Sequence, residues 1–260
     1  MSETADFERR FGGTRRLYGS SAEPVFAAHV AVVGIGGVGS WVAEALARLG
    51  MGRLTLIDMD HVAESNINRQ IHATDTSLGQ AKVLAMKERI NSFHPECCVS
   101  TIDEFVTPDN WLEIATQLHA EGVNVVVDAC DQLRAKVAMA SWAARARAPL
   151  VCVGAAGGKR RPQAVELDDL SLVTHDPLLA KLRYELRKHH GGARSGRMGL
   201  QCVFSREAVL PAQDQCGVDG AGDGSLNCHG YGSAATVTAT FAMVAAAAAA
   251  DLCIQRVGSR

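Results

Sequence analysis

The stretch from residue 29 to residue 58 constrains the fold of this chain more than any other part. The apolar run His29–Val33 leads into the glycine-rich segment Gly34–Gly39 (GIGGVG), and a helical pattern and a second apolar run precede Asp58. Glycines at this spacing permit a tight strand-to-helix turn, close approach of the backbone to a phosphate, and close packing of helix on strand. The helix N-terminus then attracts an anion, and Asp58 lies where a carboxylate binds ribose hydroxyls. The stretch predicts a nucleotide site.

A polar cluster further along indicates which part of the nucleotide is held. Asn66, Asn68, Arg69 and Gln70 lie in a segment with few apolar residues, and Lys82 follows. Loops of this kind serve binding more often than packing, although an isolated Arg or Lys usually just faces solvent. A redox dinucleotide needs a second half-site and does not need these two cations. We therefore expect Arg69 and Lys82 to meet phosphates.

Short apolar runs alternate with helical patterns through the first two thirds of the chain. Strands of this kind, rich in Val, Leu and Ile, are buried on both faces. Strand alternating with helix predicts an α/β fold with a doubly wound, mostly parallel, Rossmann-like sheet. The expected strands are Val30–Val33, Leu54–Asp58, Val99–Ile102, Val123–Asp128 and Leu150–Val153, and the expected helices are Ser40–Leu49, Leu78–Ser92, Asp109–His119 and Asp131–Arg147.

Three aspartates lie where expected strands end or helices begin. Asp58 and Asp128 end strands, and Asp131 opens the next helix. Because ligands of such sheets bind beyond the carboxyl ends of the strands, we expect all three to point toward one crevice. Two plainer roles stay open, since Asp131 could be a helix N-cap and Asp128 a turn residue.

Together these motifs make the chain similar to known enzymes. Over residues 10–155 it resembles the ubiquitin-activating-enzyme-like superfamily, through the glycine-rich segment, Asp58–Asp60, Asn66–Gln70, Lys82 and Asp128–Asp131. Within that superfamily it is similar from end to end to the bacterial tRNA threonylcarbamoyladenosine dehydratases. The stretches that carry this closer resemblance are Arg10–Thr14, Phe105–Asn110, Asp176–Leu178, Cys202–Ser205 and Thr236–Phe241.

The resemblance implies an enzyme that activates a carboxylate with ATP and Mg²⁺ and forms an acyl-adenylate. The acid would be the threonylcarbamoyl group on the tRNA adenosine next to the anticodon, which loses water and closes into a ring. Arg69, Lys82 and Asp131 would be catalytic, with Asp131 also holding Mg²⁺, and a monovalent cation is left open. The implied ATP-binding residues are Gly34, Gly36, Gly37, Gly39, Asp58, Asn66, Asn68, Arg69, Gln70, Lys82 and Asp131.

The same resemblance implies how the chain is organised. We expect a single adenylating domain, with residues 1–155 binding ATP and residues 156–260 on the substrate side. It also implies a homodimer and an association with a cysteine desulfurase and sulfur-acceptor system. Related enzymes often reach the partner's ATP with a second arginine in an Arg-aromatic-x-Arg pattern. Here Gly13 stands in that place, so a contribution in trans, by Arg15 or Arg16, stays open.

Positive charge is concentrated in the second half of the chain. The expected helix Leu178–His190 and the residues after it hold many cations, although the net charge of the whole chain is −2. This asymmetry favours docking of a polyanion on one face, and the single aromatic residue of the run, Tyr184, favours contact with a phosphate backbone over base stacking. The residues are Lys181, Arg183, Arg187, Lys188, His189, His190, Arg194 and Arg197, with a further cluster at Lys159, Arg160 and Arg161.

Cys228 lies in a glycine-rich segment, residues 213–232, that predicts a long mobile loop before a C-terminal helix. Beside a helix N-terminus the pKa of a thiol falls, so this cysteine could take over an activated acyl group. It could equally be a small packing residue. By resemblance it matches a cysteine of the dehydratases, but ring closure within the substrate needs no thioester, and its covalent role stays open.

The segment Ala234–Ile254 is nearly uncharged and long enough to span a bilayer. Alanine gains little from burial in lipid, and threonines and Asp251 interrupt the run. We therefore expect an alanine-rich core helix that covers one face of the sheet, and no stable membrane insertion. The first residues have neither a basic nor an apolar signal region, so a cytoplasmic protein is expected.

The eight cysteines are scattered, and no Cys-x-x-Cys pair occurs among them. They are typical of cytosolic thiols, and they exclude the two-pair zinc site that sulfur-carrier adenylyltransferases of the superfamily hold. Three other functions stay open. The first is adenylation of the C-terminus of a small sulfur-carrier protein, the second is a dinucleotide oxidoreductase, and the third is a non-catalytic tRNA or sulfur-relay adaptor.

Overall fold

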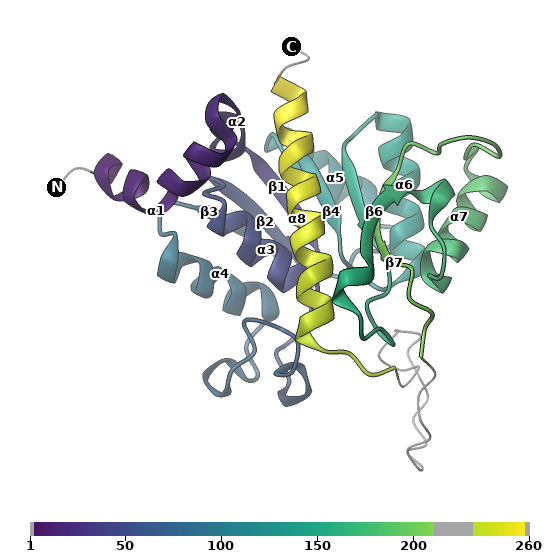
Figure 1. Ribbon diagram of the computed structural model, residues 1–260, viewed down its shortest axis with the longest axis horizontal. Helices are drawn as coiled ribbons and strands as arrows, with labels where there is room; N and C mark the ends of the chain where they lie inside the picture. Colours follow the sequence, from purple (N-terminus) through teal and green to yellow (C-terminus); the bar gives the residue numbers. More distant parts are fainter. Residues whose placement is uncertain (1–2, 211–230, 258–260) are drawn as a thin grey trace.

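Seven strands form one sheet in the order β3-β2-β1-β4-β5-β7-β6 in the computed structural model, which describes residues 3–210 and 231–257 (Figure 1). Neighbouring strands are parallel except that β6 runs antiparallel to β7. The predicted α/β class with a mostly parallel sheet is confirmed. The strands are β1 His29–Val33, β2 Arg53–Ile57, β3 Cys98–Ile102, β4 Val125–Asp128, β5 Leu150–Val153, β6 Val165–Asp169 and β7 Gln201–Ser205.

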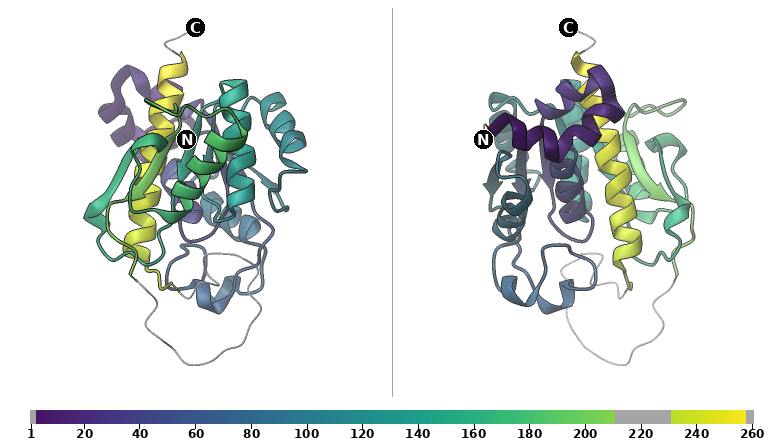
Figure 2. Two further views of the ribbon diagram at one scale, coloured as in Figure 1. Left: turned by 90° about the vertical axis from the view of Figure 1, so that its right-hand side faces the viewer. Right: turned by 60° about the vertical axis from the view of Figure 1, so that its left-hand side comes forward.

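Helices cover both faces of the sheet, as the doubly wound prediction requires (Figure 2). One face carries α3, α4 and α8, and the other carries α5, α6 and α7. Helix α1 and the short helix α2 pack beside them near the N-terminus. The helices are α1 Glu3–Tyr18, α2 Ala22–Phe26, α3 Gly39–Arg48, α4 Lys82–Phe93, α5 Trp111–Ala120, α6 Leu133–Ala146, α7 Pro177–His189 and α8 Ala235–Val257.

The central strand β1 divides its side chains between two hydrophobic cores. Val30 and Val32 pack in the core beneath α3, α4 and α8, whereas Ala31 and Val33 pack in the core beneath α5, α6 and α7. Because successive side chains of a strand point to opposite faces, a strand that is apolar at every position must be covered on both. The unbroken apolar runs of the sequence therefore require a three-layer architecture.

The alanine-rich helix α8 lies across one face of the sheet (Figure 1). It contacts α3, β4, β5, β6 and β7, and Phe241 and Ala245 are fully buried in this contact. It is the one helix in the described residues that is long and apolar enough to cross a membrane, and 56% of its apolar window is buried inside the protein. The predicted core helix is confirmed.

One difference from the predicted elements bears on the site. The helix expected from Leu78 begins only at Lys82. The residues before it run beside the segment that follows β2, where Val62 N donates to Gln80 O at 2.8 Å and Gly79 N donates to Val62 O at 2.9 Å. This pairing places Lys82 at the first turn of α4. The sheet also joins the two predicted parts of the chain, because β5 pairs directly with β7.

Candidate active site

The glycine-rich turn between β1 and α3 lies at the carboxyl edge of the sheet. Gly34 has a φ of +84°, and its N–H donates to Ile57 O at 2.8 Å, which ties the turn to β2. A Cβ on Gly39 would lie 1.7 Å from Gly34 O, so only glycine lets α3 begin this close to the strand. A Cβ on Gly36 would meet only a side-chain nitrogen of Gln70, at 4.0 Å. The backbone at Gly36 is therefore open to a ligand.

Asp58 stabilises the glycine-rich turn between β1 and α3. Its two oxygens accept hydrogen bonds from Ile35 N at 2.6 Å and from Asp60 N at 2.8 Å. The residue is 8% exposed, and burial raises the pKa of its carboxyl despite the nearby Lys82 and these two amides. Asp58 thus fixes the position of the glycine turn, and ribose binding would use the remaining lone pairs of the same oxygens.

Lys82 lies at the start of α4 and points back to the segment that follows β2. Its ammonium donates to Asp60 Oδ2 at 2.6 Å. The lysine side chain is 8% exposed, whereas the Asp60 side chain is 51% exposed, so the pair opens to solvent on one side only. A phosphate could replace Asp60 as the partner of Lys82 without a change in the backbone.

The polar cluster forms a tight loop against the glycine turn. Asn66 and Gln70 are buried, and Ala63 N donates to Asn66 Oδ1 at 3.1 Å, which closes the loop on itself. A Cβ on Gly37 would lie 3.3 Å from Cγ and Cδ of Arg69, so the arginine stem packs on the turn. Arg69 Nη1 donates to Ser65 O at 2.7 Å. The structure thus brings Arg69, Gln70 and the glycine turn together, as predicted.

The N-terminal end of α8 supports this loop. Asn68 Nδ2 donates to Ser233 O at 2.8 Å, and Ala235 N donates to Asn68 O at 3.2 Å. On the other side Trp41 Nε1 donates to Arg69 O at 2.9 Å. Residues separated by more than 160 positions therefore position the arginine. The role of α8 in the site could not be read from local motifs, because its partners are backbone carbonyls.

Two buried polar atoms beside the turn have no hydrogen-bond partner in the described part of the chain. They are Ser40 Oγ, in the first turn of α3, and Gln70 Oε1. Buried polar atoms are nearly always satisfied, so these two fit a site that a polar ligand or water completes. Ser40 was not among the predicted site residues, and a serine after Gly39 carries no signal that separates binding from packing.

Asp131 lies between β4 and α6, two residues before the first residue of the helix. The N-cap of α6 is Gln132, so Asp131 is not the capping residue that one reading of the sequence allowed. In the described ranges no three metal-ligating side chains come together. A Mg²⁺ ion in this crevice would therefore take one carboxylate from Asp131 and its other ligands from phosphate oxygens and water, an ordinary set for this ion.

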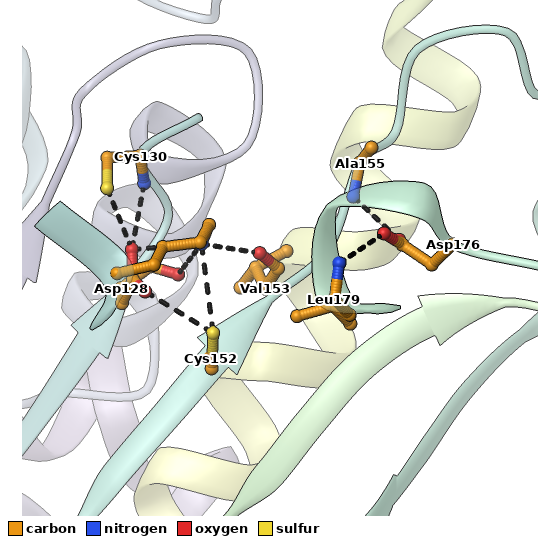
Figure 3. A network of polar contacts seen from close by, with 8 residues as sticks. Asp128, Cys130, Cys152, Val153, Ala155, Asp176 and Leu179 are labelled. Carbon is orange, nitrogen blue, oxygen red and sulfur yellow. Dashed lines mark hydrogen bonds and ion pairs between the residues drawn. The ribbon is translucent and has the colours of Figure 1, made fainter. Parts of the chain in front are cut away.

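Asp128 does not point into the crevice, and the prediction that it does was wrong. The residue is fully buried and forms an ion pair with Lys136 of α6, at 3.0 Å (Figure 3). The sequence pattern held a signal that was missed. Lys136 lies in the apolar stripe of α6 with Met139, Ala140 and Ala143, and a lysine there needs a buried partner.

Fewer of the basic side chains in the second half of the chain are exposed than the sequence indicated. Lys159 is 3% exposed and donates to His175 O at 2.8 Å and to Glu207 O, so it is a structural residue and not part of a surface cluster. Arg183 donates to the carbonyls of Leu170 and Val173. A surface hollow of about 550 Å³ nevertheless remains, lined by Ala180, Arg183, Tyr184, Arg187, Lys188 and Arg194.

Cys228 and most of the predicted loop 213–232 lie outside the described residues. Arg15, one candidate for a contribution across a dimer, pairs with Glu8 at 2.6 Å and with Glu23 in its own chain. The contact with Glu23 ties α1 to α2. Both the thiol and the arginine in trans therefore stay predictions.

Comparison with known proteins adds a family to this geometry. Residues 15–258 match the ThiF family, which is nearly the whole chain. The chain belongs to the ThiF family. It is 46% identical over 248 residues to the tRNA threonylcarbamoyladenosine dehydratase of Escherichia coli (strain K12), with 92% of this chain and 91% of that protein covered. It is 37% identical over 260 residues to the enzyme of the same name from Haemophilus influenzae, with 98% and 97% covered.

Solved structures of ThiF-family proteins have the same architecture. The E. coli dehydratase in complex with ATP superposes with a TM-score of 0.85 at 42% identity, and 97% of each chain is covered. The same enzyme in complex with AMP also gives a TM-score of 0.85 over 97% of each chain, at 43% identity. The resemblance inferred from the motifs is confirmed over both predicted parts of the chain.

Proposed function

We propose that this protein uses ATP to dehydrate the threonylcarbamoyl group on the tRNA adenosine next to the anticodon, by way of an acyl-adenylate. The observation that carries the proposal is a phosphate-type crevice in a chain that is similar over 97% of its length to a dehydratase solved with both ATP and AMP. AMP is the nucleotide that an adenylating reaction releases. A redox dinucleotide does not need both Arg69 and Lys82 beside the glycine turn.

The residues of the crevice suit a triphosphate. The open backbone at Gly36 would let a phosphate approach, and the N–H groups at the start of α3 would donate hydrogen bonds to its oxygens. Lys82 would exchange Asp60 for a phosphate, and Arg69, whose stem packs on Gly37, would bind from the opposite side. Bringing two cations to the place where charge develops is the main means of catalysis available here.

Magnesium fits the same crevice through Asp131, as described above. Bound Mg²⁺ would neutralise charge on the phosphates and help to orient them. The chain's own contribution is a carboxylate on the turn after β4, which packs against the glycine turn. We include Mg²⁺ as a cofactor on this basis, whereas a monovalent cation stays a prediction from the resemblance.

The reaction needs little beyond positioning. The substrate carboxylate attacks the α-phosphorus, the bond to the β-phosphate breaks, and pyrophosphate leaves. A nucleophilic atom of the same threonylcarbamoyl group then attacks the activated carbonyl, loses its proton to solvent and expels AMP. AMP carries away the oxygen that the carboxylate supplied, so the net change in the nucleoside is loss of one water. Because the nucleophile is intramolecular, Cys228 need not form a thioester.

The hollow on α7 is the tRNA-facing surface in this proposal. Lys188 and Arg194 line it and belong to the same basic run as the exposed His189 and His190. Positive charge without base-reading groups suits the phosphate backbone, whose binding weakens steeply with salt. Replacing both Lys188 and Arg194 by Ala should weaken tRNA binding about tenfold at low salt and lower the slope of log affinity against log salt by about 2, with ATP binding unchanged. A binding titration at several salt concentrations measures this, and unchanged binding would place the tRNA elsewhere.

Several partner statements rest on the resemblance alone and stay predictions. They are the homodimer and the cysteine desulfurase and sulfur-acceptor system. The cytoplasmic location, which was expected from the first residues of the chain, is also proposed. The division of one adenylating domain into an ATP-binding part, residues 1–155, and a substrate side, residues 156–260, is likewise proposed and not tested. Sedimentation of the purified protein would decide the oligomeric state directly.

One experiment tests the proposed function. The purified protein is incubated with ATP, Mg²⁺ and tRNA that carries threonylcarbamoyladenosine, and both AMP and the mass of the nucleoside are followed. The expected result is AMP together with a nucleoside that has lost one water. The molybdopterin-synthase adenylyltransferase of Salmonella typhimurium is 33% identical over 124 residues, so a sulfur-carrier protein is the alternative acceptor. AMP formation that requires such a carrier and ignores the tRNA would overturn the proposal.

A further inference from the structure

A lysine is sealed beneath the carboxyl ends of β4 and β5. Lys136 of α6 is fully buried, and its ammonium donates to Asp128 Oδ1 at 3.0 Å and to Val153 O at 2.7 Å (Figure 3). Asp128 O, at 3.4 Å, is a further acceptor. Burial by itself lowers the pKa of Lys136, but the surrounding groups, with Asp128 first among them, together more than offset this, and the pKa is raised. The ammonium therefore stays charged inside the protein.

The carboxylate that pairs with Lys136 also holds the turn after β4. Asp128 Oδ1 accepts from Cys130 N at 3.2 Å and from Cys130 Sγ at 3.0 Å, and Asp128 Oδ2 accepts from Cys152 Sγ at 3.3 Å. A charge-assisted acceptor makes a stronger bond to a backbone N–H than a neutral one does. The turn that leads to Asp131 is thereby fastened to the interior through one carboxylate.

This turn is pressed against the glycine turn on its other side. A Cβ on Gly34 would lie 2.9 Å from the N and Cα atoms of Cys130, and a Cβ on Gly39 would lie 3.3 Å from Ala129 Cβ. The two turns are therefore in close van der Waals contact. A shift at Cys130 would therefore change the distance between Asp131 and the backbone at which we place the phosphates.

The same network reaches the substrate side. The strand that offers Val153 O to Lys136 continues into Ala155, whose N–H donates to Asp176 Oδ2 at 2.8 Å (Figure 3). Asp176 Oδ1 accepts from Leu179 N at 2.9 Å and so caps α7. Lys136 thus lies between the turn that carries Asp131 and the segment that anchors the basic helix.

We propose that Lys136 is a positioning residue, which acts through Asp128 to hold the turn of residues 129–131 so that Asp131 faces the phosphates of ATP. The inference rests on the proposed function for the ATP site. It assigns to a buried lysine, far from solvent, a share in nucleotide binding. Neither residue of the pair touches the ligand.

The test removes the whole pair, so that no buried charge is left alone. Replacing both partners by apolar side chains of similar volume is often neutral for folding, whereas removing one partner is not. The variant Asp128→Leu with Lys136→Met removes the acceptor for Cys130 N. The variant Asp128→Asn with Lys136→Met keeps an acceptor oxygen and serves if the first does not fold. The matched control is Glu44→Met with Arg89→Met, which removes the pair that joins α3 and α4 at 2.8 Å.

Two measurements decide the outcome. Amide hydrogen exchange of the peptide that contains residues 129–132 should quicken about tenfold in the first variant, less in the second, and not in the control. Calorimetry should show ATP binding in Mg²⁺ weakened about tenfold, with little change in EDTA. Exchange and affinity equal to those of the unaltered protein, in either folded variant, would overturn the inference. If the unaltered protein binds no ATP, the proposed function fails, and the exchange data still decide whether the pair holds the turn.

Discussion

Two lysine–aspartate pairs lie at the carboxyl ends of neighbouring regions of the sheet, and they differ in almost every physical respect. Lys82 and Asp60, after β2, are 2.6 Å apart, and the aspartate side chain is 51% exposed. Lys136 and Asp128, at the end of β4, are 3.0 Å apart and both fully buried. The first pair is open to a ligand on the side of Asp60, whereas the second has no exposed side chain.

The difference shows how the same two residue types serve two tasks. In the first pair Lys82 is buried but Asp60 is half exposed, so water can solvate the aspartate, and we expect a phosphate to displace it at small cost. In a buried pair each charge depends on the other, because neither has water to replace its partner. We therefore expect substitution at the open pair to change chemistry and substitution at the sealed pair to change the fold.

The largest effect is expected when the sealed pair loses one member. Lys136→Met leaves Asp128 buried without its cation, which should lower the free energy of unfolding by about 3–5 kcal/mol. Urea denaturation measures the loss. Combining Asp128→Leu with Lys136→Met should restore most of the lost free energy of unfolding. If Lys136→Met alone were as stable as the unaltered protein, Asp128 would not need its cation for stability.

The open pair should respond in activity and not in stability. Lys82→Ala removes a cation from the proposed phosphate site and should lower the rate of AMP formation about 10²–10³-fold, with a small change in the free energy of unfolding. Lys87→Ala, on the same helix α4, is the matched control and should retain full activity. Comparable losses in both variants would show that the charge of α4 as a whole matters, and not Lys82.

A histidine near the open pair should make stability depend on pH. His72 is 3% exposed, and burial, with the charges of Lys82 and Arg89, lowers its pKa from 6.5 to about 4. The unfolded chain therefore binds the proton more readily, and stability is lost as the pH falls from above 6.5 toward 4. Between pH 7 and pH 5 this residue should account for about 2 kcal/mol.

The comparison of His72→Gln with the unaltered protein isolates that contribution. Urea denaturation at both pH values should show a smaller loss in the variant, by about the stated amount. Equal losses in the two proteins would mean that folding does not lower the pKa of His72. The buried His29 and His94, whose pKa values burial also lowers, are present in both and cancel.

The smallest effect sharpens the contrast between the two aspartates. Asp60→Asn removes a half-exposed charge and should lower the free energy of unfolding by less than about 1 kcal/mol. Asp128→Asn, the same chemical change in the sealed pair, should have a several-fold larger effect. Urea denaturation of the two variants measures the two losses in free energy of unfolding. Similar losses would show that Asp60 and Asp128 contribute equally to stability.

The glycine turn and the sheet could be predicted from the sequence because their signals are local. The unbroken apolar runs required helices on both faces, and the spacing of Gly34 to Gly39 required a strand-to-helix turn. The prediction that Arg69 and Lys82 bind phosphates likewise rests on neighbours in the chain, because cations in or beside a loop poor in apolar residues serve binding more often than packing. Each of these inferences used residues that are neighbours in the chain.

The errors share a different cause. Asp128 and Lys159 were assigned to a crevice and a surface from their types and positions, but both are buried. Their partners are Lys136 in one case and the carbonyls of His175 and Glu207 in the other. Whether a charged side chain points outward or inward depends on what the next layer of the fold offers it. That choice has no local signature beyond a charge in an apolar stripe.

The amino-acid sequence by itself determined the class of fold, the glycine-rich turn and the family, because hydrophobic period and glycine spacing act over a few residues. Only the tertiary structure decided that Asp128 is buried with Lys136 and does not face the crevice. It also showed that the start of α8 supports the loop of Arg69, through contacts between Asn68 and Ser233. The physical reason is that a charged side chain can be buried only where polar partners surround it, and folding brings those partners together from distant segments of the chain.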